Sequence, residues 1–219
     1  MKSIQQIIEE QVQRWQVLNR EEKVQPVKRS VITISREPGS GGRIIATQLA
    51  NKLGFDLFHQ EVLHQMAQSA NVNTRLLETL DEKGLNLLEE TISAVINEHH
   101  LWPDEYLKHL MKVIGVIAEH GRSVLVGRGG NFILSKEHCL RVRVVAPLPI
   151  RVKRVSKEFG LSAEEAKRRV IRTESDRRAF IRKYFYADVA DPLNYDLVIN
   201  TEFLSISEAV ESICCVVGE

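Results

Sequence analysis

The chain has 219 residues, of which 43% are hydrophobic and 27% are charged, and its formal net charge is +1. A chain of this size and composition can bury one good hydrophobic core without disulfides or metals to hold it together. The near-zero charge argues against a general nucleic-acid binder, because such proteins usually carry a marked basic excess.

The cysteines and the apolar segments of the chain indicate the cellular compartment in which the protein is expected. The three cysteines are Cys139 and the adjacent Cys214 and Cys215. An odd number without a Cys-x-x-Cys spacing predicts free thiols and disfavours a zinc site. The first residues lack the apolar core of a signal peptide, and the longest apolar run, near residues 113–118, is too short to span a bilayer. We therefore expect a cytoplasmic protein without a membrane segment, and we predict no metal-ligating side chains.

Apolar residues recur at near-helical spacing over residues 4–20, which predicts an amphipathic helix. We expect its apolar face to pack on the chain's own domain, and the alternative is a helix that joins copies into a homo-oligomer. A short polar linker with Pro26 follows at residues 21–29. We divide the chain into this N-terminal helix with its linker, residues 1–29, and one domain, residues 30–219.

A glycine-rich turn follows the first predicted strand. Residues 31–34 favour a short buried strand, and a helix is predicted to run from the turn to Gly54. A strand that leads into a glycine turn and a helix aims backbone N–H groups and the positive end of the helix dipole at one point, where a phosphate can bind. The candidate phosphate-binding residues of the turn are Gly39, Ser40, Gly41 and Gly42.

The turn matches the phosphate-loop pattern G-x-x-x-x-G-K-[ST] only in part. Gly41 fits the second glycine. Arg36, Gly42 and Arg43 stand where the pattern has its first glycine, its lysine and its hydroxyl residue. Arg36 or Arg43 is therefore the candidate for the missing cation, although a guanidinium does not replace an ammonium group geometrically. Glycines that serve only tight helix–strand packing are the competing explanation.

Strands and helices alternate along the rest of the chain. The further predicted strands are residues 55–58, 123–126, 140–145 and 196–199. Residues 71–120 are helical almost throughout, and two later helices begin with capping boxes at Ser162 to Glu165 and Ser205 to Glu208. This alternation predicts an α/β fold whose parallel sheet is covered by helices on both faces.

Two arginine-bearing segments are candidate anion sites. Gly127-Arg128-Gly129-Gly130 directly follows a predicted strand, at the carboxyl end where open parallel sheets place their ligands. Residues 151–183 hold twelve Lys and Arg residues against five Asp and Glu residues, which suits a polyanionic ligand. A plain turn and a solvated basic face are the respective alternatives.

The run from Ser35 to Arg43, with Ile45-Ala46 and Leu49-Ala50 behind it, resembles the cytidylate kinase-like family, where Gly-Ser-Gly-Gly-Arg replaces a lysine-bearing phosphate loop. The resemblance spans about residues 31–217. It implies a P-loop NTPase-type three-layer α/β fold with a five-stranded parallel sheet. It also implies a helical insertion at about residues 60–120 and an arginine-rich lid at about residues 160–190.

The function that the resemblance implies is a nucleoside monophosphate kinase-like phosphotransferase, moving the γ-phosphate of ATP to a (d)CMP-like acceptor with Mg²⁺. The expected donor-binding residues are Arg36, Gly39, Ser40, Gly41, Gly42 and Arg43. The expected acceptor-binding residues are Arg128, Gly129 and Asp176. The residues expected to act on the transferring phosphate are Arg43, Arg172, Arg177 and Arg178. The family has an acidic residue where this chain has Gly129, so the acceptor base stays open.

Two other functions remain open. A catalytically degenerate nucleotide-binding sensor or regulatory protein would keep the fold, and the missing lysine and hydroxyl favour it. A nucleic-acid-binding module on residues 151–183 is less favoured, because base stacking would need more aromatics than Phe159 and Phe180. As partners we expect nucleotides, and neither a membrane nor nucleic acid.

Overall fold

The structure is a computed structural model that describes residues 3–18, 30–137 and 139–218. Five strands form one parallel sheet in the order β2-β3-β1-β4-β5. They are β1 (Val31–Arg36), β2 (Asp56–Phe58), β3 (Ser123–Val126), β4 (Cys139–Val145) and β5 (Leu197–Asn200). In the centre of the sheet, Ile32 of β1 pairs with Val124 of β3 and with Leu140 of β4. The predicted five-stranded parallel sheet is confirmed.

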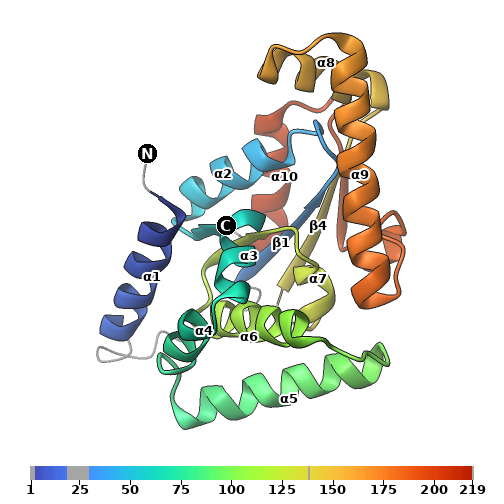
Figure 1. Ribbon diagram of the computed structural model, residues 1–219. Coiled ribbons are helices and arrows are strands. Elements are labelled where there is room, and N and C mark those ends of the chain that lie inside the picture. Colours follow the sequence, from blue (N-terminus) through green and yellow to red (C-terminus); the bar gives the residue numbers. More distant parts are fainter. Residues whose placement is uncertain (1–2, 19–29, 138, 219) are drawn as a thin grey trace.

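Helices fill the connections between the strands. The first six are α1 (Ile4–Leu18), α2 (Gly42–Leu53), α3 (Gln60–Gln68), α4 (Ala70–Leu77), α5 (Glu82–Glu98) and α6 (Glu105–His120). They are followed by α7 (Gly130–Ile133), α8 (Leu148–Phe159), α9 (Ala163–Phe185), the 3₁₀ helix η1 (Pro192–Asn194) and α10 (Ile206–Val217). The predicted helical insertion is α3 to α6, and the lid is the hairpin of α8 and α9, which projects beyond the sheet (Figure 1).

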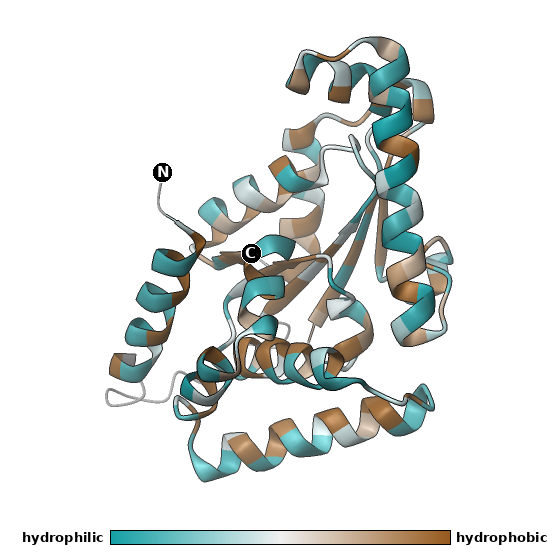
Figure 2. Cartoon of the chain, in the orientation of Figure 1, coloured by the Kyte–Doolittle hydropathy of each residue, from teal (hydrophilic) through white to brown (hydrophobic). Residues whose placement is uncertain are grey.

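The side chains of β1 alternate between two hydrophobic clusters, which gives the fold its three layers. Ile32 and Ile34 are buried in a cluster with α2 and α10. Val31 is buried on the other face, in a cluster that includes residues of α3, α6 and α7. Figure 2 shows apolar residues concentrated on the strands and on α6, whereas α9 is mostly hydrophilic. The cavity described below lies on the face of Val31.

Helix α1 packs on the chain's own domain, as the sequence favoured. Ile8, Val12 and Trp15 are buried in the cluster that contains α3 and α6. The Trp15 ring lies 5.9 Å from the Phe58 ring, between centroids, and stacks on the His120 ring at 4.4 Å. This apolar face is therefore not available to a second copy. The predicted linker at residues 21–29 lies outside the described residues.

Local signals set the helix starts. Both predicted capping boxes form: the Ser162 and Ser205 hydroxyls accept from the N–H groups of Glu165 and Glu208, whose carboxylates accept in return. A cap of this kind stabilises a helix by about 1 kcal/mol.

In the described part of the chain no helix is both long and apolar enough to cross a membrane. Among the described residues, Cys139, Cys214 and Cys215 form no disulfide.

Candidate active site

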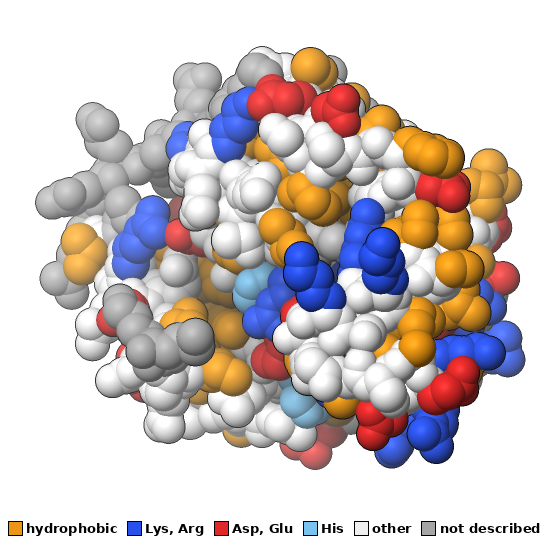
Figure 3. Space-filling model, turned by 90° about the horizontal axis from the view of Figure 1, so that it is seen from above, with side chains coloured by type: hydrophobic (Ala, Val, Ile, Leu, Met, Phe, Trp, Pro, Cys, Tyr) orange, Lys and Arg blue, Asp and Glu red, His pale blue; other side chains and the backbone are white. Residues whose placement is uncertain are grey.

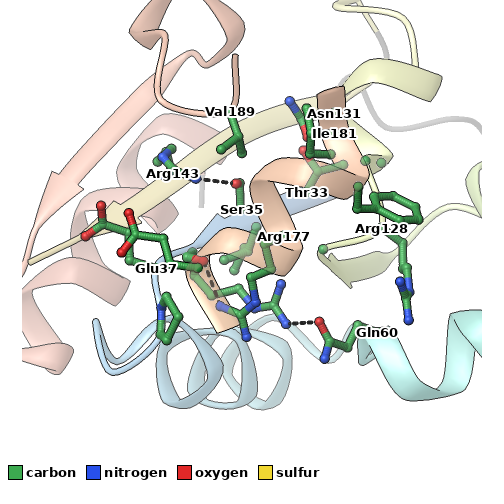
Figure 4. Close-up of a pocket in the computed structure, with 18 of the residues that line it drawn as sticks. Thr33, Ser35, Glu37, Gln60, Arg128, Asn131, Arg143, Arg177, Ile181 and Val189 are labelled. Carbon is green, nitrogen blue, oxygen red and sulfur yellow. Dashed lines mark hydrogen bonds between the residues drawn. The ribbon is translucent and has the colours of Figure 1, made fainter. Parts of the chain in front are cut away.

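A cavity of about 240 Å³ opens at the carboxyl ends of β1, β3 and β4, between the sheet, α7 and α9. Thr33 and Ser35 of β1 line it, because alternate residues of this strand face away from α2. Its charged lining residues are Arg36, Glu37, Arg128, Arg143, Glu174, Asp176 and Arg177. Figure 4 shows how several of these side chains gather from different elements around one space.

Arg128 is held in an unusual turn between β3 and α7. Gly127, Arg128 and Gly129 all have left-handed backbone angles, with φ of 80°, 54° and 72°. For Arg128 this conformation is strained by roughly 1–2 kcal/mol, since an L side chain rarely adopts it. Gly129 has no room for a side chain, because a Cβ there would lie 2.3 Å from the Phe185 ring. Strain of this kind is often retained where it positions a functional group.

Two buried donors at this turn have no protein partner. Among the side chains that the structure describes, Nε of Arg128 and Nδ2 of Asn131 are buried without a hydrogen bond. The Arg128 guanidinium instead lies over the Phe180 ring, 5.1 Å from its centroid. A buried donor left unsatisfied costs about 1–3 kcal/mol. Oxygen atoms of a ligand would satisfy both groups.

Arg36 and Arg177 meet on another wall of the cavity. Nη2 of Arg36 donates to Oε1 of Gln60 at 2.6 Å, and Nη1 of Arg177 donates to the carbonyl oxygen of Arg36 at 2.9 Å. Burial, together with the nearby cations Arg177 and Arg128, lowers the pKa of Arg36 to about 9. Burial also lowers the pKa of Arg177 to about 10, with Arg143 and Arg128 contributing. These lowered pKa values mean that the charged guanidinium groups are destabilised until an anion joins them.

The carboxylates of the cavity are engaged largely by one arginine of α8. Nε of Arg151 lies 3.4 Å from Oε2 of Glu37, and its Nη1 donates to Oε2 of Glu174 at 2.9 Å. Arg178 also pairs with Glu174, at 2.8 Å. This chain of ion pairs ties the loop after β1 to α9. It also neutralises two carboxylates that would otherwise compensate the cavity arginines.

The resulting charge balance favours an anionic ligand. Four arginines and three carboxylates line the cavity, and Arg151, outside that lining, already pairs with two of the carboxylates. On the surface, Figure 3 shows several Lys and Arg side chains grouped near the middle of one face, with most Asp and Glu side chains toward its rim. Clustered cations of this kind attract polyanions such as phosphate esters.

The glycine-rich loop lies beside the cavity and is held from two sides. A Cβ on Gly39, whose φ is +78°, would lie 2.6 Å from the carbonyl oxygen of Arg151, so α8 packs directly on the loop. Oγ1 of Thr201 donates to the carbonyl oxygen of Ser40 at 2.7 Å, and Nη1 of Arg154 donates to the same Thr201 oxygen at 2.8 Å. The loop is therefore fixed by the end of β5 and by the lid.

The start of α2 presents N–H groups in the way that phosphate loops do. Gly41 caps the helix in a left-handed conformation, and the helix begins at Gly42. The first N–H groups of a helix have no acceptor within it, so those of Gly42 and Arg43 can reach an anion. The Arg43 side chain is exposed at this point.

The structure divides the predicted site residues into three groups. Those that line the cavity are Arg36, Arg128, Gly129, Asp176 and Arg177. Those in the loop beside it are Gly39, Ser40, Gly41, Gly42 and Arg43. Arg172 and Arg178 are exposed on α9, away from the cavity lining. Arg36, expected with the donor loop, instead points toward Gln60 and Gly127.

Sequence reasoning missed four charged residues of this site, which are Glu37, Arg143, Arg151 and Glu174. Arg143 follows Arg141 in β4, where arginine and valine alternate. That alternation was the available signal, since charged residues at every second position of a central strand line one face. Glu37 and Arg151 gave no such signal, because they meet only through the packing of α8 on the loop.

Comparison with known proteins places this geometry in a family. The model of the cytidylate kinase-like family matches residues 31–203. The chain belongs to the cytidylate kinase-like family. It is accordingly a kinase, an enzyme of the transferase class.

Named relatives and a solved structure agree with this assignment. A cytidylate kinase of Ignicoccus hospitalis is 29% identical over 184 residues, covering 84% of this chain and 96% of that protein. A cytidylate kinase of Methanopyrus kandleri is 29% identical over 188 residues, covering 81% of this chain and 88% of that protein. The crystal structure of an uncharacterized protein from Eubacterium ventriosum shares the fold, with a TM-score of 0.64 at 21% identity, covering 85% and 97% of the two chains.

Proposed function

We propose that this member of the cytidylate kinase-like family transfers the γ-phosphate of ATP to the phosphate of a nucleoside monophosphate-class acceptor. The acceptor phosphate binds in the cavity between Arg36, Arg128 and Arg177. The observation that carries the proposal is the pair of buried donors without partners in the described residues, Nε of Arg128 and Nδ2 of Asn131, in a cavity that also holds the desolvated arginines Arg36 and Arg177. A phosphate supplies both the acceptor oxygens and the negative charge that these groups lack.

The donor phosphates bind at the start of α2, where the N–H groups of Gly42 and Arg43 are the first of the helix. Arg154 is fixed next to this loop through Thr201 and supplies a cation near it, in place of the missing lysine. Mg²⁺ accompanies ATP, although the described residues include no cluster of three or more His, Cys, Asp or Glu side chains suited to a metal.

Phosphoryl transfer then needs positioning and charge stabilisation, which these residues supply. An oxygen of the acceptor phosphate forms a bond to the γ-phosphorus, the bond from the γ-phosphorus to the β–γ bridging oxygen breaks, and ADP leaves. Arg128 holds the acceptor phosphate. Arg177, fixed to the carbonyl group at the end of β1, lies between the cavity and the loop and stabilises the charge on the transferring group.

The acceptor base is recognised without the acidic residue that the family carries after its Gly-Arg pair. Gly129 occupies that position, and the Phe185 ring leaves no space for a carboxylate there. Recognition of the rest of the acceptor therefore falls to other residues of the cavity.

The test is a coupled assay of ADP formation with ATP and a panel of the common nucleoside monophosphates, followed by variants of Arg128. We expect Arg128→Ala to raise the acceptor KM by about tenfold to a hundredfold, because charge-assisted hydrogen bonds contribute about 1.5–3 kcal/mol. The donor KM should change little. Arg128→Lys should recover only part of the loss, since an ammonium group cannot make the paired contact.

The control is Arg168→Ala, which removes an exposed arginine of α9 outside the cavity lining and should leave both KM values unchanged. Unchanged KM values in a folded Arg128→Ala variant would show that the turn is only structural. Binding of both nucleotides without ADP formation would favour a regulatory nucleotide-binding protein instead.

A further inference from the structure

Strand β4 carries two buried arginines on the same sheet face, Arg141 and Arg143, which are 6% and 5% exposed. Arg141 is neutralised inside the protein: its Nη2 and Nε donate to the carboxylate of Asp196 at 2.6 and 3.1 Å. Arg143 donates from Nη1 to Oγ of Ser35 at 2.8 Å and lies 5.6 Å from the centroid of the Tyr195 ring. In the described part of the chain, no carboxylate lies within ion-pair distance of it.

A buried guanidinium without a counter-ion is costly, because it has lost its hydration and gained no opposite charge. Arg143 differs from Arg141 in one more respect, since only Arg143 lines the cavity. A guanidinium has five N–H donors, and within the described residues those of Arg143 are engaged only by hydroxyl groups, of Ser35 and Tyr195. The remaining donors can serve a ligand in the cavity.

The hydroxyl groups around Arg143 are already held in place. The Tyr195 O–H lies 2.9 Å from the carbonyl oxygen of Val189 and 3.2 Å from Oγ of Ser35. Burial raises the pKa of Tyr195, which keeps its hydroxyl protonated and neutral. Tyr195 therefore cannot serve as the missing anion.

Arg143 lies apart from the arginines assigned to the acceptor phosphate. Figure 4 shows Arg143 beside Ser35 and Val189 on one side of the space, whereas Arg177 and Arg128 lie on the other side, toward Gln60. One phosphate bound between Arg36, Arg128 and Arg177 leaves Arg143 without a partner. The cavity thus presents two cationic positions.

We propose that the acceptor carries a second anionic group, a carboxylate or a second phosphate, that pairs with Arg143. The inference rests on the proposed function and specifies its substrate class: a nucleotide-like molecule with two separated anionic groups. The absence of space for an acid at Gly129 agrees with it, because the base-recognition device of the family is not formed here.

The experiment measures binding by calorimetry with two matched ligand pairs. UMP is compared with orotidine 5′-monophosphate, which adds a carboxylate, and CMP is compared with cytidine 3′,5′-bisphosphate, which adds a phosphate. We expect one of the two-anion ligands to bind at least about tenfold more tightly than its partner, which corresponds to roughly 1.4 kcal/mol. The pair that shows the gain identifies the group. Arg143→Gln should abolish the gain, so that the two members of that pair bind with similar affinity.

Thermal unfolding of the ligand-free protein separates a ligand-binding role from a structural one. Arg143→Met should raise Tm, because it removes a buried cation without a counter-ion, whereas Arg141→Met should lower Tm, because it removes the guanidinium that pairs with Asp196. A lower Tm in Arg143→Met, or a gain in affinity that survives Arg143→Gln, would overturn the inference.

The remaining outcomes distinguish the two proposals. If wild type binds and phosphorylates a monophosphate but gains nothing from the second anion, the inference fails and the proposed function stands. If a two-anion ligand binds through Arg143 without any phosphoryl transfer, the proposed function fails and the second anion site stands. Binding of none of the four ligands, together with no ADP formation on any monophosphate of the panel, overturns both.

Discussion

The region around α1 and the region around the cavity differ in how their polar side chains are partnered. Near α1, the partly exposed Arg75 pairs with Glu9 at 2.8 Å. The His120 ring stacks on Trp15, and its Nε2 lies 2.9 Å from Oγ1 of Thr79. Folding alone completes these contacts. This region therefore serves stability.

In the cavity, by contrast, several buried polar groups are not fully partnered within the described residues. Nε of Arg128 and Nδ2 of Asn131 have no partner among the described residues, and Arg143 has a hydroxyl and a ring but no carboxylate. Buried polar groups in proteins are nearly always paired. Within the described residues, the two side-chain donors that are buried without a hydrogen bond both belong to residues that line the cavity. The comparison teaches that such donors, rather than the number of arginines, distinguish the ligand site.

The largest effect is expected when an acidic side chain is placed at Gly129, the position where the family carries one. Gly129→Asp should destabilise the protein by at least about 3 kcal/mol, because it combines a left-handed conformation with a steric clash against Phe185 and a buried carboxylate. Gly160→Asp is the matched control: Gly160 also has a positive φ, of +64°, but no atom lies within 4 Å of its added Cβ. That variant should lose only about 1 kcal/mol. Urea unfolding measures both, and equal losses would show that Phe185 moves aside.

A smaller effect is expected near α1, where the protonation of His120 changes the free energy of unfolding. Burial lowers the pKa of His120 to about 4, below its unfolded value near 6.5. The unfolded state therefore binds more protons between these values, so stability falls as pH decreases from 6.5 to 4, by about 2–3 kcal/mol. His120→Phe keeps a ring against Trp15 and removes the titration.

Urea unfolding of wild type and His120→Phe at pH 7, 5.5 and 4.5 measures this difference. The variant should lose less stability on acidification, by about the amount that His120 contributes. Adding a nucleoside monophosphate at constant pH should leave the gap between the two proteins unchanged, since His120 lies outside the cavity lining. If wild type and His120→Phe lose the same stability on acidification, groups other than His120 cause the effect.

The smallest effect compares two arginines of α9 that differ in position. Arg177→Ala should lower kcat by at least about tenfold, or roughly 1.4 kcal/mol of barrier, because Arg177 lines the cavity and is fixed to the end of β1. Arg172→Ala should change kcat by less than about threefold, because Arg172 is exposed outside the lining. Steady-state assays measure both. Equal losses would indicate that the hairpin of α8 and α9 closes further during turnover.

Much of the fold was predictable because its signals are local. The alternation of apolar residues marked the strands, the two Ser-x-x-Glu boxes marked the starts of α9 and α10, and the glycine run after Arg36 marked the strand–turn–helix unit. The resemblance to the cytidylate kinase-like family added the parallel sheet and the hairpin. Each of these features depends on residues within a few positions of one another.

The site depended on contacts that local patterns do not encode. Helical spacing indicates which arginines of α9 share a face, but only packing on the sheet decides that Arg177 faces the cavity and Arg172 faces solvent. Arg36 likewise turned to the cavity because Gly127, which lies far along the chain, leaves space for its guanidinium.

The sequence by itself determined the order of the elements, the family and the positions of the two glycine-rich turns. Only the tertiary structure decided that Asp196 neutralises Arg141 while Arg143 stays without a carboxylate, although the two arginines are two residues apart in one strand. The physical reason is that a buried charge is balanced by groups brought close in space by folding. Which charge remains for a ligand is therefore a property of the packed chain.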